Sequence, residues 1–211
     1  MATWLWTIHN FVHQTVNTVK PKRSIPFRPY GLGAVAVLYT TCDDFDPVAC
    51  LSGIKQSHRN TRLIICDDSR DESSRGHIDR WAAQVGPRVT IMRRPDSRGL
   101  KAGNLNYAIA TAVREEFIVV CDADEVLPED FVARILCELE LDKLAFVQCR
   151  HTARNPAQSW FEEVLGPAID VFYRFTLPSR NRFGFTCCFG HGLIGPTKCM
   201  GVSWSVPRGC M

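Results

Sequence analysis

The sequence predicts an α/β fold with a mostly parallel central sheet. Short apolar runs rich in β-branched residues alternate along the chain with segments whose apolar residues recur at helical spacing. Strands without a polar face, separated by amphipathic helices, are typical of a parallel sheet covered on both sides. The 211 residues are 45% hydrophobic and 22% charged, which indicates a globular chain with a packed core rather than a disordered one.

The apolar runs and the helical segments after Gly33 follow one another in strict alternation. The first helix is expected to begin at Asp46 and Pro47 and the last at Pro128, because an acidic cap and an early proline favour helix starts. The expected strands are residues 34–40, 62–66, 88–92, 116–121 and 144–149, and the helical spacing covers 48–54, 78–85, 105–112 and 131–139.

Two segments flank the expected domain, which spans residues 33–195. Residues 1–32 contain an amphipathic stretch with Trp4 and Trp6, followed by a linker rich in proline and basic residues. This stretch is expected to lie on a membrane surface or against the domain. Residues 196–211 are expected to be an irregular tail. Because no apolar run reaches about 18 residues, the sequence predicts no transmembrane helix.

Charge and cysteine content narrow the classes of function. The formal net charge of +3 is too small to predict a nucleic-acid partner. The ten cysteines include no C-x-x-C pair, which argues against a structural zinc site. Several of them, among them Cys66, Cys121 and Cys149, end apolar runs, as buried reduced thiols do in a cytosolic compartment.

Polar and acidic residues follow the expected strands. Ligands of parallel α/β sheets bind outside the carboxyl ends of the strands, so these residues are the candidates for chemistry. They are Thr40 and Asp43 after the first strand, Asp67 and Asp68 after the second, Lys101 in the turn before the third helix, and Asp122 and Asp124 after the fourth strand.

Each candidate has a functional and a structural interpretation. Asp122 and Asp124 offer the oxygen ligands that Mg²⁺ or Mn²⁺ prefers beside a phosphate, or they form a solvated turn. Asp67 and Asp68 accept hydrogen bonds from a base or a ribose, or they complete a turn. Lys101 meets a phosphate, or it is merely solvated.

The order of these segments resembles the family 2 glycosyltransferases, particularly the cellulose synthase- and hyaluronan synthase-like branch. The resemblance covers roughly residues 33–195 and implies a GT-A type nucleotide-sugar-binding sandwich. It implies metal-dependent transfer of a sugar, with inversion, from a UDP-sugar to a carbohydrate or lipid-linked acceptor during polysaccharide synthesis. Mg²⁺ or Mn²⁺ is the implied cofactor, and the cytoplasmic side of a membrane is the implied location. The segments that carry the resemblance are VAVLYTTCDD, LIICDDS, RGLKAGNLN, FIVVCDADEVLPEDF and FVQCRH.

The resemblance also implies roles in donor binding. Thr40 and Asp43 are expected to line the nucleotide pocket, and Asp67 or Asp68 to meet the uracil. Lys101 is expected to contact the diphosphate.

Further roles concern the metal and the acceptor. The resemblance implies that Asp122 and Asp124 hold the metal on the diphosphate. Residues 183–195 resemble the acceptor-side segment of the family, in which Cys188, Gly190 and His191 are expected nearest the sugar.

The carboxylate base of the family has no counterpart in this sequence. In the family it is an Asp in a Thr/Ser-Glu-Asp motif after the acceptor-side segment, whereas here no acidic residue follows Asp170. The later Gln-x-x-Arg-Trp motif is also missing. The chain is therefore expected to be incomplete at its carboxyl end, and no catalytic base is assigned; His191 as a substitute base is a minor alternative.

Two other classes of function stay open. One is a non-catalytic nucleotide-sugar-binding fragment, which the missing base favours. The other is a receiver-like phosphoacceptor domain, which also places acidic residues and Mg²⁺ at strand ends. Receivers are shorter and do not require the KAGNLN turn. A dinucleotide-binding enzyme is disfavoured because no G-x-G-x-x-G follows a strand.

Overall fold

A computed structural model describes residues 33–142, 144–152, 160–185 and 188–203. The expected amphipathic segment at residues 1–32 and the last eight residues of the expected tail, 204–211, lie outside the described residues. The described residues form two units: one contains residues 33–148 and 190–203, and the other lies within Cys149–Phe189. Each unit is considered by itself.

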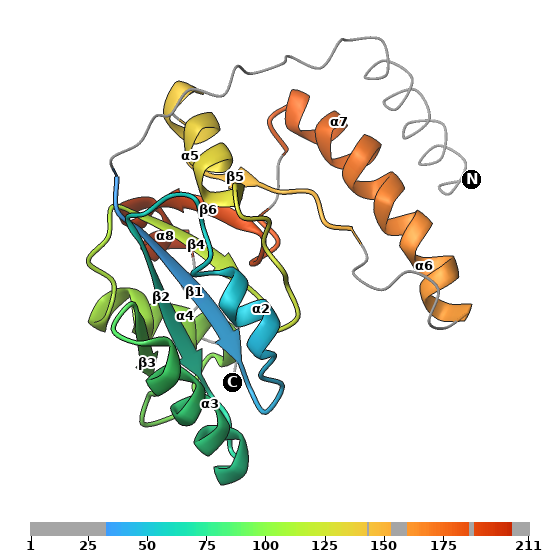
Figure 1. Ribbon diagram of the computed structural model, residues 1–211. Coiled ribbons are helices and arrows are strands. Elements are labelled where there is room, and N and C mark those ends of the chain that lie inside the picture. Colours follow the sequence, from blue (N-terminus) through green and yellow to red (C-terminus); the bar gives the residue numbers. More distant parts are fainter. Residues whose placement is uncertain (1–32, 143, 153–159, 186–187, 204–211) are drawn as a thin grey trace. The chain divides into compact units, whose positions relative to one another are not determined.

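The first unit is built on a six-stranded sheet with the order β3-β2-β1-β4-β6-β5 (Figure 1). β1 pairs in parallel with β2 and β4, and β2 with β3, while β6 runs antiparallel to β4 and β5. The expected α/β fold with a mostly parallel sheet is therefore confirmed. The strands are β1 (Val35–Thr41), β2 (Thr61–Asp67), β3 (Val89–Met92), β4 (Phe117–Cys121), β5 (Val147–Gln148) and β6 (Leu193–Pro196).

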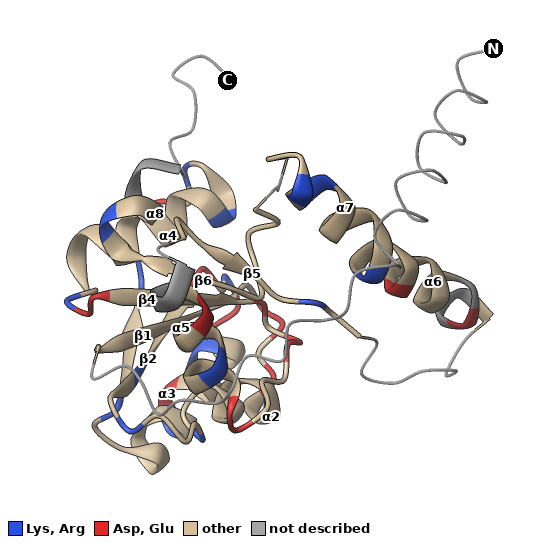
Figure 2. Ribbon diagram, turned by 90° about the horizontal axis from the view of Figure 1, so that it is seen from above, with Lys and Arg blue, Asp and Glu red and all other residues tan. Residues whose placement is uncertain are grey.

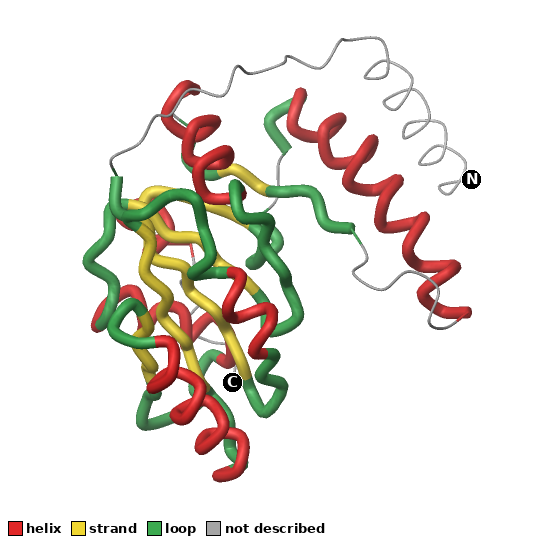
Figure 3. The backbone as a smooth tube through the Cα atoms, in the orientation of Figure 1, coloured by secondary structure: helices red, strands yellow, loops and turns green. Residues whose placement is uncertain are grey.

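Helices lie on both sides of this sheet (Figure 3). The strands β1, β4 and β6 carry no charged residue, so charge is confined to other parts of the unit (Figure 2). The side chain of Asp46 accepts hydrogen bonds from the first turn of α2, as its position before Pro47 predicts. The helices are α2 (Pro47–Ser52), α3 (Glu72–Val85), α4 (Leu100–Thr111), α5 (Phe131–Asp142) and α8 (Thr197–Ser203).

Helices α4 and α8 cover one face of the sheet with a continuous apolar core. Leu105 and Ala108 of α4 and Met200 of α8 pack there with Ala36 and Leu38 of β1. All seven residues of β1 are buried, as expected for a central strand covered on both faces.

Three segments differ from the sequence-based expectation. The strand expected at 144–149 is reduced to Val147–Gln148, and residues 197–203 of the expected irregular tail form α8. Strand β6 lies within the expected acceptor-side segment and was not predicted, because Gly195 and Pro196 obscure its β pattern. A Cβ at Gly195 would stand 2.8 Å from Met200 Sδ, so glycine permits the close approach of α8.

The second unit is helical, and its helices were not predicted from the sequence. It comprises α6 (Trp160–Val171), the π-helical turn η1 (Phe172–Thr176) and α7 (Leu177–Arg182). Asp170 pairs with Arg174 at 2.7 Å and with Arg150. In the described part of the chain, no helix combines the length and the apolar character needed to cross a membrane.

We expect Met200→Ala to lower the free energy of unfolding by about 2–5 kcal/mol, because Met200 is a core residue whose truncation leaves a cavity. Denaturant unfolding followed by circular dichroism measures this change. Lys198→Ala is the matched control, since Lys198 lies on the same helix and is exposed. If the two substitutions lower the free energy of unfolding equally, the Met200 side chain does not contribute to the core.

Candidate functional site

A cavity of about 660 Å³ opens at the carboxyl ends of β1, β2 and β4. Its position is the one that parallel α/β sheets use for ligands. Much of its lining comes from polar and charged side chains of three strand-end loops and of the first turns of α4. The lining residues are Thr40, Thr41, Cys42, Asp44, Asp68, Arg70, Ser97, Leu100, Lys101, Asn104, Asp122, Ala123 and Asp124.

Lys101, Asp122 and Asp124 all line this cavity, although the sequence separates the lysine from the aspartates by about twenty residues. The Lys101 ammonium forms an ion pair with Oδ1 of Asp122. The hydroxyl of Thr40 lies 3.2 Å from the same carboxylate oxygen and 3.1 Å from the carbonyl oxygen of Cys121. The end of β1 thus holds the acidic turn that follows β4.

A third carboxylate, which the sequence analysis did not single out, supports this acidic turn. Glu125 accepts a hydrogen bond from the backbone N–H of Asp122 at 3.0 Å and pairs through its other oxygen with His191 Nδ1 at 2.7 Å. His191 Nδ1 also stands 4.0 Å from Oδ2 of Asp122. The sequence feature that could have identified Glu125 is its position directly after Asp124, at the same strand end.

His191 is held in place from two sides. Gln148 of β5 donates to the backbone carbonyl of His191 at 2.9 Å, and Glu125 holds the ring. The hydrogen bond to Glu125 raises the pKa of His191 above its ordinary value, against the opposing effect of burial. Gly190 adopts a left-handed φ of 80° immediately before it, a conformation that suits glycine.

Buried Tyr39 fixes the middle of the acidic turn. Its hydroxyl donates to the carbonyl of Ala123 at 2.8 Å and accepts from the backbone N–H of Asp46 at 3.0 Å. Burial raises the pKa of Tyr39, so the phenol stays a donor. The same side chain therefore joins the turn after β4 to the start of α2.

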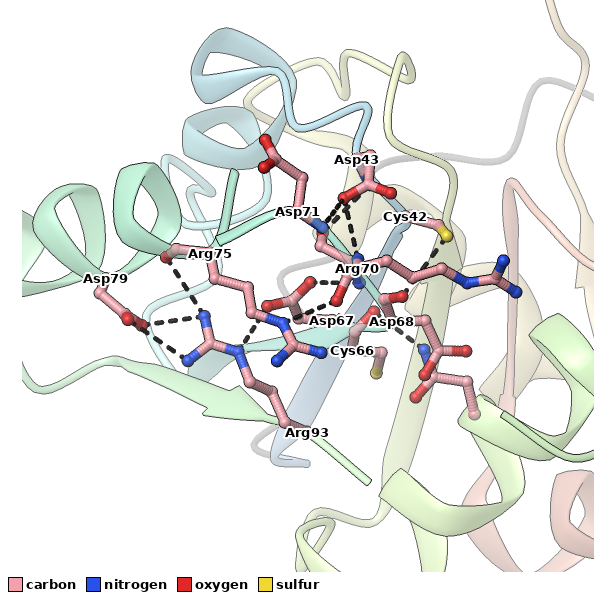
Figure 4. Close-up of polar contacts among 12 residues, drawn as sticks. Cys42, Asp43, Cys66, Asp67, Asp68, Arg70, Asp71, Arg75, Asp79 and Arg93 are labelled. Atoms are coloured by element: carbon pink, nitrogen blue, oxygen red, sulfur yellow. Dashed lines mark hydrogen bonds and ion pairs between the residues drawn. The ribbon is translucent and has the colours of Figure 1, made fainter. Parts of the chain in front are cut away.

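The two aspartates that end β2 have different surroundings. Asp68 lines the cavity, and the guanidinium of Arg94 binds both of its carboxylate oxygens, at 2.8 and 2.5 Å. The side chain of Asp67 is fully buried and accepts hydrogen bonds from Ser69 N at 2.9 Å and from Arg93 Nε at 2.6 Å (Figure 4). Asp67 is not among the residues that line the cavity, so of the two only Asp68 is placed to meet a ligand there.

Asp43 is not among the residues that line the cavity. Its carboxylate accepts hydrogen bonds from the backbone N–H groups of Arg70 and Asp71 at 2.9 and 3.0 Å (Figure 4). It thereby joins the loop after β1 to the loop after β2, and its φ of 67° is a strained value for a non-glycine residue. Asp44 lines the cavity instead and accepts from the backbone N–H of Cys42 at 2.7 Å.

The expected acceptor-side residues fall in both units. Gly190 and His191 belong to the first unit, whereas Cys188 is an exposed thiol of the second. Within the first unit, the structure brings His191 to the acidic turn.

The family model for glycosyl transferase family 2 matches residues 48–198. The chain belongs to glycosyl transferase family 2. This membership confirms the resemblance to the family 2 glycosyltransferases and disfavours the receiver-like alternative. No curated protein matches the chain.

Solved structures of this fold are similar to the chain. The mannosyltransferase PcManGT from Pyrobaculum calidifontis, in complex with GDP-Man and Mn²⁺, is 23% identical, with a TM-score of 0.55 over 75% of this chain and 48% of that chain. S. aureus TarS 1-349 is 15% identical, with a TM-score of 0.52 over 78% of this chain and 47% of that chain. The chain thus spans about half the length of these proteins, and the likeness supports the expected GT-A fold.

The pairing of His191 with Glu125 predicts a pH-dependent stability. Because the folded-state pKa of His191 is raised, its contribution is fully present below the ordinary histidine pKa of about 6.5 and is lost as the pH rises through the folded-state value. We therefore expect His191→Gln to be less stable than the wild type at acidic pH, by a margin that shrinks toward alkaline pH. Urea unfolding across this range measures the margin.

Glu125→Gln is the matched variant for this measurement, since it removes the carboxylate and keeps an amide of similar size. Glu125→Gln should lose the same pH-dependent part of the free energy of unfolding as His191→Gln. The double variant should lose no more of it than either single variant. A margin that grows with pH would contradict the pairing.

Proposed function

We propose that the first unit binds the donor of a metal-dependent glycosyltransferase, which transfers a sugar from a UDP-sugar to an acceptor hydroxyl with inversion. The observation that carries this proposal is that Lys101, Asp122 and Asp124 line the same cavity, with Lys101 paired to Asp122. The lysine supplies the positive charge that suits a diphosphate, and the two aspartates supply the negative charge that suits its metal ion. Family membership supports the reaction class.

The donor set fits a divalent cation. Asp122 and Asp124 offer hard carboxylate oxygens on one short turn, the type of ligand that Mg²⁺ and Mn²⁺ prefer when phosphates complete the coordination. Tyr39 and Glu125 hold the backbone of this turn at Ala123 and Asp122, respectively. When bound, the ion stabilises the negative charge that develops on the departing diphosphate.

Lys101 is the second electrostatic element. Its ammonium already lies against Asp122 and is within the lining of the same cavity. We assign it to the diphosphate, where a cation forms charge-assisted hydrogen bonds with phosphate oxygens. The same assignment explains why the carboxylate at the strand end has a basic partner from α4 rather than from its own loop.

The nucleoside is assigned to the lining residues at the ends of β1 and β2. Asp68 is the proposed partner of the uracil, since Asp67 is buried and already paired. Thr40 stays with the nucleotide pocket, and Asp43 acts by shaping the loops around it. His191 and Gly190 are assigned to the acceptor side.

The order of the sequence motifs supports a place in the cellulose synthase- and hyaluronan synthase-like branch. We accordingly propose polysaccharide synthesis on a carbohydrate or lipid-linked acceptor, at the cytoplasmic side of a membrane surface. A second candidate is a nucleotide-sugar-binding domain without transfer activity.

Calorimetric titration of UDP into the full chain, with and without Mn²⁺, tests the donor site. We expect binding that depends on the metal and that weakens about tenfold or more in Asp122→Ala/Asp124→Ala, as expected when charged hydrogen-bond partners are lost. Glu138→Ala is the control, because Glu138 is an exposed carboxylate of α5 outside the cavity. A folded chain that binds neither UDP nor GDP under either condition would refute the donor site.

Release of UDP from UDP-glucose and UDP-N-acetylglucosamine then separates the two candidate functions. Turnover above that of the double aspartate variant indicates a transferase. Metal-dependent binding without turnover indicates the binding domain.

A further inference from the structure

We propose that Arg94 is a positioning residue that sets Lys101 at the cavity. The proposal rests on the proposed function only in assigning a phosphate to Lys101. Arg94 follows β3, and its side chain is 4% exposed. It does not line the cavity, so its influence on a ligand is exerted through the groups that it binds.

The guanidinium of Arg94 joins two walls of the cavity. Toward β2 it binds both carboxylate oxygens of Asp68, at 2.8 and 2.5 Å. Toward α4 it donates to the carbonyl of Arg98 at 2.5 Å and to that of Leu100 at 2.9 Å. A planar, forked donor can satisfy these acceptors together, whereas a lysine ammonium cannot reproduce the fork.

The turn held by Arg94 is strained. Gly99 and Leu100 have successive left-handed φ values of 71° and 48°, and a leucine rarely adopts such a value. Helix α4 begins at Leu100 without a side-chain cap. Such a conformation persists only where its surroundings impose it, and Arg94 supplies bonds to carbonyls on both sides of Gly99.

Close packing leaves this turn little room. A Cβ at Gly103 would stand 1.9 Å from the carbonyl oxygen of Arg98 and 2.6 Å from Nη1 of Arg94. The carbonyl that Arg94 binds therefore rests directly on the first turns of α4. Lys101 follows Leu100 immediately, so the strained turn sets where the lysine side chain starts.

Arg93 provides a matched control within the same loop. It is the neighbouring arginine and pairs with the neighbouring aspartate, Asp67, at 2.6 Å. Its other partners are Asp79 and the carbonyl of Arg75 (Figure 4). None of these partners belongs to the 98–100 turn, so a change at Arg93 removes a comparable ion pair without releasing the turn.

The first experiment measures amide hydrogen exchange of the full chain without ligand. In Arg94→Gln, and in Arg94→Lys as a milder second variant, we expect exchange over residues 98–104 to rise about tenfold or more, as for the loss of charged hydrogen bonds. In Arg93→Gln the same segment should exchange as in the wild type. Equal acceleration of residues 98–104 in the Arg93 and Arg94 variants would overturn the positioning role.

The second experiment compares the affinities for UDP and UMP in the presence of Mn²⁺. Only UDP carries the diphosphate to which Lys101 is assigned. Arg94→Lys should reduce the UDP-to-UMP affinity ratio as Lys101→Ala does, and should not reduce it further in the Lys101→Ala background. An unchanged ratio, or additive losses, would overturn the proposal. Failure of the wild-type chain to bind UDP would instead count against the donor site, while the exchange result still decides the role of Arg94 in the turn.

Discussion

The hydrogen-bonded ladder of β1 is the constraint on which the rest of the site depends. β1 pairs in parallel with β2 along Val35–Thr41 and with β4 along Val35–Tyr39. Because the three strands run in the same direction and in register, their carboxyl ends reach one edge together. The residues after them, far apart in the sequence, are thereby placed around a single cavity, with Lys101 reaching it from α4. A strand paired in another register would scatter these groups.

The second constraint is electrostatic. Several carboxylates gather at this edge, and like charges at short range would repel one another in a half-buried cavity. Four of these carboxylates have a basic partner: Asp67 has Arg93, Asp68 has Arg94, Asp122 has Lys101 and Glu125 has His191. These partners come from different loops, so the ion pairs also tie the loops together. The same charges that suit a diphosphate and its cation thus also hold these loops in place.

Residues at the edge divide into those that face the cavity and those that hold the facing residues. Asp68, Asp122 and Lys101 face it, whereas Tyr39 and Arg94 bind backbone carbonyls and carboxylates behind it. Residues of the second kind carry no sequence signal of their own. In a sequence, a tyrosine within a strand is typical of the core, and an arginine after a strand is typical of the charged surface.

The sequence by itself determined the architecture and the chemical types at the strand ends. Four of the five expected strands and all four expected helices were recognised, because period and capping are local properties of the chain. β6, α8 and the helices of the second unit were not predicted, because their formation depends on packing against other elements. The close approach of Gly195 and Met200 is an example. Only the tertiary structure decided between neighbours such as Asp67 and Asp68 or Asp43 and Asp44. A strand end presents one side chain to the cavity and the next to the loops, and that choice is made by the packing of arginines and backbone amides distant in sequence.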